Sequence, residues 1–142
     1  MAAVLLICAI IVFVFLFIPR HFIDGGAEFA SLRLICHDER VEAEIDDLSS
    51  NPAYDELKTA LSDVLCIRTL SRHSYSLDDT DYVLHLWTDD GRYCGMAVGT
   101  DLNGRVFRIC WKGEETVGHE FAILNYAYVE GNLTQAIRAL AG

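Results

Sequence analysis

Hydrophobic positions form one unbroken run at the start of the chain and shorter periodic patterns after it. Residues 2–18 are all uncharged and apolar, and the run ends at Pro19. As a helix this stretch would be about 25 Å long, and Phe22 and Ile23 would bring it closer to the roughly 30 Å of a bilayer core. The pattern predicts a transmembrane helix over residues 1–23, with a cleaved signal peptide or a buried core helix as alternatives.

The charge next to this run predicts its orientation. Arg20 is the first basic residue after the run, and basic residues beside a span tend to stay on the cytoplasmic side. We therefore expect a single-pass membrane protein that contacts the membrane through residues 2–18 and carries its C-terminal domain in the cytoplasm. Residues 24–30 are expected to form a juxtamembrane linker, and residues 31–142 one domain.

The first half of this domain favours helix. Asn51 and Pro52 suit the N-cap and first position of a helix, and apolar residues then recur every three or four positions. The spacing predicts a helix over Pro52–Leu65. Upstream, Val41–Leu48 fits two structures, because its apolar residues alternate as in a strand while its Glu and Ala residues favour a helix. We expect the helix there.

The second half favours strands separated by two turns. Asp90-Gly91 and Asn103-Gly104 supply the positive φ angles that two-residue type I′ hairpin loops need. Three strands are therefore predicted, over Tyr82–Thr88, Arg92–Gly99 and Arg105–Lys112.

Two-residue loops would fix the register of these strands. Trp87 would lie opposite Cys94, and Met96 opposite Trp111. Nine side chains would then share one face, which we expect to pack against the helices. They are Val83, His85, Trp87, Cys94, Met96, Val98, Phe107, Ile109 and Trp111. The same register predicts that Cys94 and Cys110 point to opposite faces.

Three further segments complete the predicted architecture. Phe121–Val129 indicates a fourth strand, with a helix as the alternative, and Cys66–Arg72 indicates an edge strand. Asn132 is typical of the cap of a short C-terminal helix. The expected fold class is α+β: a transmembrane helix, then a small antiparallel β-meander of three to five strands packed on one face by helices.

Composition narrows the partners. The chain has 21 acidic and 11 basic residues and a formal net charge of −10. This charge repels phosphate backbones, so we expect no nucleic acid, and a partner protein or a small ligand remains. Cys8 lies in the apolar run and the other four cysteines include no C-x-x-C pair. Free thiols are favoured over two disulfides, and a zinc site is disfavoured.

Two residue pairs are candidates for chemistry. His85 and Cys94 share a face in the predicted register and could form a nucleophile pair or hold a metal. However, a His and a Cys among Trp and Met are more typical of a core. His119 and Glu120 are the second pair, although neighbours in a strand point apart.

The sequence therefore favours a binding or interaction module over an enzyme. It contains no Gly-rich phosphate loop, no G-x-S-x-G elbow and no H-E-x-x-H helix, and we expect no cofactor and no metal. The alternative function is a membrane-anchored enzyme with its site around His85 and Cys94 or around His119 and Glu120.

Overall fold

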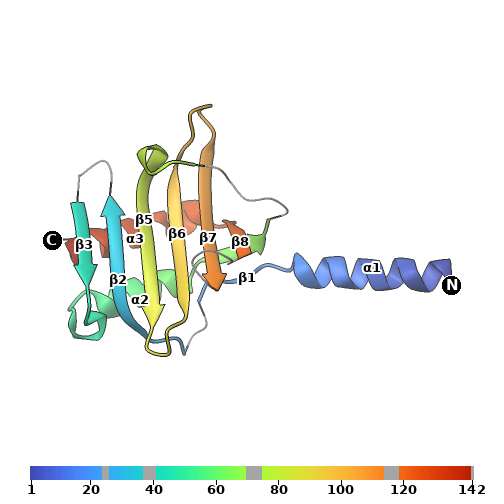
Figure 1. Cartoon of the computed structure of the whole chain (residues 1–142), viewed down its shortest axis with the longest axis horizontal. Coiled ribbons are helices and arrows are strands. Elements are labelled where there is room, and N and C mark those ends of the chain that lie inside the picture. Colours follow the sequence, from blue (N-terminus) through green and yellow to red (C-terminus); the bar gives the residue numbers. More distant parts are fainter. Residues whose placement is uncertain (24–25, 37–40, 70–74, 114–118, 142) are drawn as a thin grey trace.

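An antiparallel β-sheet carries two helices on one face and has a third helix projecting away from it (Figure 1). The computed structural model describes residues 1–23, 26–36, 41–69, 75–113 and 119–141. Over these residues eight strands pair in the order β1-β4-β8-β7-β6-β5-β2-β3. The strands are β1 (Arg20–His21), β2 (Phe29–Cys36), β3 (Val41–Ile45), β4 (Leu65–Arg68), β5 (Thr80–Thr88), β6 (Tyr93–Thr100), β7 (Val106–Gly113) and β8 (His119–Ile123). The helices are α1 (Ala2–Leu16), α2 (Tyr54–Ser62) and α3 (Tyr126–Ala141), with 3-10 turns at Leu48–Ser50 and Leu77–Asp79.

Helix α1 is too short for the membrane span expected over residues 1–23. It has 15 residues, about 22 Å of helix against a hydrocarbon core of about 30 Å. Within the described residues, no helix is both long and apolar enough to cross a membrane. The expectation of a single-pass membrane protein, on which the cytoplasmic placement of the C-terminal domain depended, is therefore wrong. Phe22 and Ile23, expected to lengthen the span, are buried in the core of the sheet and helices instead.

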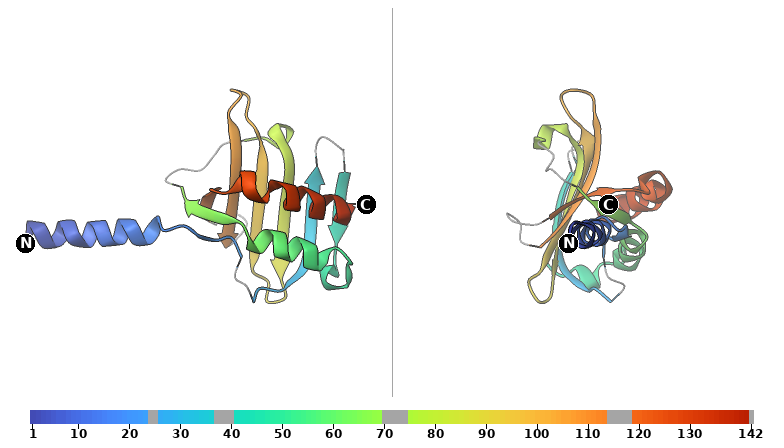
Figure 2. Two further views of the ribbon diagram at one scale, coloured as in Figure 1. Left: turned by 180° about the vertical axis from the view of Figure 1, so that it is seen from behind. Right: turned by 90° about the vertical axis from the view of Figure 1, so that its right-hand side faces the viewer.

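The main core lies between the sheet and helices α2 and α3, which cover the same face (Figure 2). Apolar residues recur at three- and four-residue spacing in both helices, and these stripes face the sheet. In α2 the buried residues are Tyr54, Leu57, Ala60 and Leu61. In α3 they include Tyr126, Val129, Leu133, Ala136, Ile137 and Leu140. The predicted helix over Pro52–Leu65 is confirmed with narrower bounds.

Both hairpin loops contain three residues instead of the predicted two. Thr88 N donates to Arg92 O (2.9 Å), and Gly91 N donates to Thr88 O (3.0 Å), so residues 89–91 form the loop. Asp101 and Arg105 close the second loop in the same way. The glycine of each loop has a positive φ, 82° and 75°, as the last residue of a three-residue loop requires.

The extra loop residue shifts both registers by one. Trp87 pairs with Tyr93, and Met96 pairs with Cys110, each one position from its predicted partner. Because side chains alternate along a strand, this shift turns β6 over relative to its neighbours.

The face composition therefore differs from the prediction. The six predicted residues of β5 and β7 do share a face, but it is the one turned away from α2 and α3, here called the open face. On this face β5 contributes Val83, His85 and Trp87, β6 contributes Tyr93, Gly95, Ala97 and Gly99, and β7 contributes Phe107, Ile109 and Trp111. The residues of β6 that the prediction placed there lie under the helices: Cys94, Met96 and Val98. Cys94 and Cys110 share that helix-covered face, against the prediction that they point apart.

Three segments adopt a structure other than the predicted one. Val41–Ile45 forms strand β3 at the sheet edge instead of a helix, because its apolar residues alternate and pair with β2. The strand predicted over Phe121–Val129 ends at Ile123, and α3 begins at Tyr126, six residues before the expected cap Asn132. The strand predicted over Cys66–Arg72 is β4, and residues 70–72 lie outside the described residues. It pairs on both sides, so it is not an edge.

The sheet is also larger than the predicted three to five strands. The hairpin of β2 and β3 was not predicted, and β2 inserts beside β5, far from it in sequence. The short strand β1 extends the other edge by pairing with β4. All five cysteines are free thiols in this fold.

Candidate functional site: a cleft at the end of the sheet

A cleft of about 690 Å³ lies where the turn between β5 and β6 meets the end of β7 and the chain before β2. This volume is typical of pockets that hold small organic ligands. The described residues that line it are Phe22, Ile23, Gly26, Ala27, Phe29, Trp87, Thr88, Asp90, Gly91, Arg92, Tyr93, Cys94, Lys112 and Gly113.

The apolar walls of the cleft come from two distant parts of the sequence. Phe22 and Phe29 belong to the main core and reach the cleft from the chain that leads into β2. Phe22 is fixed by its N–H, which donates to Val64 O at 2.9 Å. Trp87 and Tyr93 line the cleft from the open face of the sheet, as a directly opposed pair on β5 and β6 with ring centroids 5.4 Å apart.

A hydrogen-bonded aromatic cluster on the open face holds Tyr93 in place. Trp111 Nε1 donates to Tyr93 Oη at 2.8 Å, and this hydroxyl lies 2.5 Å from Nδ1 of His85. The hydroxyl accepts from Trp111, and its contact with His85 is a second hydrogen bond whose donor depends on the histidine tautomer. The Trp111 indole lies across Gly95, where a Cβ atom would come within 2.4 Å of the ring. Tyr93 is therefore positioned by packing and by hydrogen bonds on two sides.

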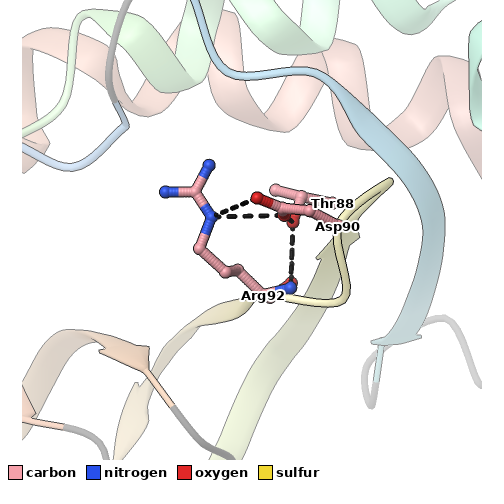
Figure 3. Close-up of polar contacts among 3 residues, drawn as sticks. All are labelled: Thr88, Asp90 and Arg92. Atoms are coloured by element: carbon pink, nitrogen blue, oxygen red, sulfur yellow. Dashed lines mark hydrogen bonds and ion pairs between the residues drawn. The ribbon is translucent and has the colours of Figure 1, made fainter.

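The polar rim of the cleft is built by the turn itself (Figure 3). Thr88 Oγ1 donates to Asp90 Oδ1 and accepts from Arg92 N at 3.0 Å. Arg92 Nε donates to both carboxylate oxygens of Asp90, at 3.2 and 2.9 Å. The hydrogen bonds from Thr88 and then from Arg92 lower the pKa of Asp90, so this carboxylate stays charged.

These contacts engage only one of the three guanidinium nitrogens of Arg92. The two terminal nitrogens make no hydrogen bond or ion pair with any residue that the structure describes. Figure 3 shows them directed away from the turn. The side chain is 72% exposed, so these donors are accessible to a ligand.

Lys112 adds a second positive charge to the cleft. Its Nζ donates to His21 O at 2.9 Å, which leaves donors of the ammonium group for other acceptors. With Arg92 and Lys112 against Asp90, the described lining residues carry a formal charge of +1. The whole chain carries −10, so these described lining residues form a positive group on an acidic protein.

The structure does not bring His85 and Cys94 together. His85 pairs with Gly95 and lies on the open face, whereas Cys94 points to the helix-covered face. Burial raises the pKa of the Cys94 thiol to about 12, so this group is protonated near neutral pH and is a poor nucleophile.

His119 and Glu120 also remain apart, because neighbouring residues of β8 point to opposite faces. Nδ1 of His119 accepts from Arg68 at 3.0 Å, and Oε1 of Glu120 accepts from Thr69 at 3.3 Å. Neither residue is among those that line the cleft.

Sequence reasoning missed the polar rim of the cleft. It identified Asp90-Gly91 as a turn but assigned no role to the side chains of Thr88, Arg92 or Lys112. A signal was present, because a threonine and an arginine flank the acidic turn and can hydrogen-bond within it. Comparisons of the chain with protein-family models, with curated proteins and with solved structures found no match.

Proposed function

We propose that this protein is a binding module that takes up a small organic ligand in the cleft at the end of its sheet. The observation that carries the proposal is the combination of aromatic walls with accessible polar donors in a space of about 690 Å³. Binding pockets have this composition: apolar over most of their surface, with a few fixed polar groups that orient the ligand.

The alternative of an enzyme has less support. The thiol of Cys94 is protonated and lies on the other face of the sheet from His85. Arg92, Lys112 and Asp90 can bind and orient a ligand, but among the described lining residues they are not joined by a histidine or a second carboxylate. General acid–base catalysis needs such a pair within reach of the substrate.

The two tryptophans allow binding to be located in the chain. Trp87 lines the cleft and Trp111 does not, and the chain has no other tryptophan. Labelling the full chain with 5-fluorotryptophan therefore gives two ¹⁹F resonances, which Trp111→Phe assigns. N-phenyl-1-naphthylamine, an uncharged aromatic compound, serves as the probe. We expect a saturable shift of the Trp87 resonance and a smaller shift of the Trp111 resonance.

Two matched variants test whether the cleft causes this shift. Gly26→Leu places a side chain in the cleft, and Gly131→Leu places the same side chain on exposed α3; both glycines have open space where a Cβ would be. The shift should disappear in Gly26→Leu and persist in Gly131→Leu. Probe bound to the projecting helix α1 would not move the Trp87 resonance. The proposal is wrong if wild-type protein shows no shift or if Gly26→Leu leaves it unchanged.

A further inference from the structure

We infer that the ligand of this cleft is an organic anion, whose acidic group binds Arg92 and whose apolar body lies against Phe22 and Phe29, on the helix side of the sheet where Arg92 points. This inference rests on the proposed function, since it names the ligand class of the same site. It is argued from how Arg92 is held, from the charge of the cleft and from a second hairpin that lacks the cleft.

Arg92 is prepared for an anion before one binds. Asp90 takes two hydrogen bonds from Nε, and the Arg92 backbone N–H is bound to Thr88 Oγ1. This anchoring orients the planar guanidinium, so a ligand need not restrict the side chain on its own. The two terminal nitrogens then present a fork of N–H donors, the arrangement that matches the two oxygens of an acidic group.

The electrostatic setting selects against other ligands. An acidic protein attracts cations over most of its surface, but among the described residues that line the cleft two cationic side chains outnumber the carboxylate of Asp90. A cation would be repelled by Arg92 and Lys112. An uncharged acceptor would form weaker hydrogen bonds with the terminal nitrogens of Arg92 than an anion does. An anion with an apolar body satisfies both the donors and the aromatic wall.

The hairpin between β6 and β7 provides an internal comparison. It has the same three-residue loop, and Arg105 follows its glycine as Arg92 follows Gly91. Arg105 Nε is 3.6 Å from Asp101 Oδ2, and its side chain is 77% exposed. Arg105 is not among the residues that line the cleft. It therefore has a similar charge and loop position outside the cleft.

The test compares two probes that share one ring system. 8-Anilinonaphthalene-1-sulfonate carries an anionic sulfonate, and N-phenyl-1-naphthylamine does not. Titrations of the 5-fluorotryptophan-labelled full chain follow the Trp87 resonance with each probe. We expect the anionic probe to bind about tenfold more tightly, as hydrogen bonds to a charged group provide.

Two charge variants then show whether Arg92 causes the difference in affinity between the two probes. Arg92→Gln should remove most of the tenfold advantage and leave the affinity for the uncharged probe within about twofold of wild type. Arg105→Gln makes the same change in net charge and should leave both affinities as they were. Equal effects of the two variants would overturn the inference, because the preference would then reflect net charge alone.

The outcomes separate this inference from the proposed function. If both probes shift Trp87 with equal affinity, or if Arg92→Gln has no effect, the cleft binds ligands but not through an anion at Arg92. If neither probe shifts Trp87 at any concentration, the proposed function itself fails.

Discussion

At the scale of single residues, Gly95 determines how the open face packs. The Trp111 indole occupies the position that a side chain at residue 95 would take. In this position Trp111 reaches the hydroxyl of Tyr93, which lines the cleft. One residue without a side chain thus connects the packing of the sheet to the geometry of the site.

We expect Gly95→Ala to lower the free energy of unfolding by about 1–3 kcal/mol, because the new Cβ forces the indole out of its place. Urea unfolding followed by circular dichroism measures the loss. In a Trp111→Leu background the same change should cost less than 0.5 kcal/mol or so, since the clash is gone. An equal cost in both backgrounds would show that Trp111 is not the cause.

The residue scale is also where prediction from sequence was weakest. Asp-Gly and Asn-Gly fit loops of two or three residues, since each loop length needs a glycine at positive φ. In the structure, Asp101 Oδ1 accepts from the backbone N–H of Asn103 and of Arg105 at 2.9 Å, and these bonds favour the longer loop. Because the loop has one residue more than predicted, the side chains of β6 lie on the opposite face from the predicted one. His85 and Cys94 therefore do not share a face.

At the scale of elements, α3 contains a glycine in its interior. Gly131 has no positive φ, and a Cβ there would meet nothing within 4 Å. The residue is exposed, so neither packing nor backbone conformation requires glycine. Glycine at this position destabilises the helix, because it loses more conformational entropy than other residues when the helix forms.

Gly131→Ala should therefore stabilise the protein by about 0.5–1 kcal/mol. The measurement is the midpoint of urea unfolding, compared at an unchanged dependence of the unfolding free energy on urea concentration. Gly91→Ala is a suitable contrast, because Gly91 has a φ of 82° and alanine is strained there; it should destabilise. A loss of stability in Gly131→Ala would show that the added methyl group disturbs a contact, against the open space at this position.

Element prediction succeeded where local signals agreed and failed where they competed. The apolar stripe of α2 and the turn signals at its start both indicate a helix, and it was predicted. In Val41–Ile45, helix-favouring Glu and Ala opposed an alternating pattern, and pairing with β2 decided for a strand. In α3, Tyr126, Val129 and Leu133 already follow helical spacing, but their aromatic and β-branched character suggested a strand.

At the scale of the whole molecule, one polar group ties the helix layer to the sheet. Glu28, just before β2, accepts from Tyr54 Oη at 2.8 Å and from Lys58 of α2. Tyr54 Oη in turn accepts from Phe29 N at 3.0 Å. The hydrogen bonds from Lys58 and then from Tyr54 lower the pKa of Glu28, and the bond with Glu28 raises the pKa of Lys58.

These shifts predict a pH window for the stability that this group provides. The pKa of Glu28 is lowered from 4.5, so its contribution is complete above that pH and is lost as the pH falls through the lowered value. The pKa of Lys58 is raised from 10.5, so its contribution is complete below that pH and is lost as the pH rises through the raised value.

Glu28→Gln should therefore lower the unfolding temperature by about 1–3 °C between these limits, an effect typical of an exposed ion pair. The difference from wild type should shrink in acid. Calorimetry across the pH range measures it, with Glu44→Gln at an exposed position of β3 as the control for charge. A difference that persists in strong acid would assign the effect to packing instead of charge.

The overall arrangement was only partly predictable. Helices on one face of an antiparallel sheet follow from short amphipathic segments and hairpin turns. The insertion of β2 beside β5 joins residues about fifty positions apart, and no local pattern specifies such pairing. The cleft depends on that insertion, because Phe22 and Phe29 reach it from the chain that enters β2.

The two ends of the strand order have a consequence for association. An outer strand with unpaired backbone groups is a template on which another chain can add a strand. Here one outer strand, β1, has two residues, too few to template a ladder. The other, β3, presents exposed glutamates at positions 42 and 44. Glu42 is paired with Arg33 of β2, and the charge of Glu44 disfavours an added strand from an acidic copy of the same chain. Growth by sheet extension is thus discouraged at both edges of the sheet.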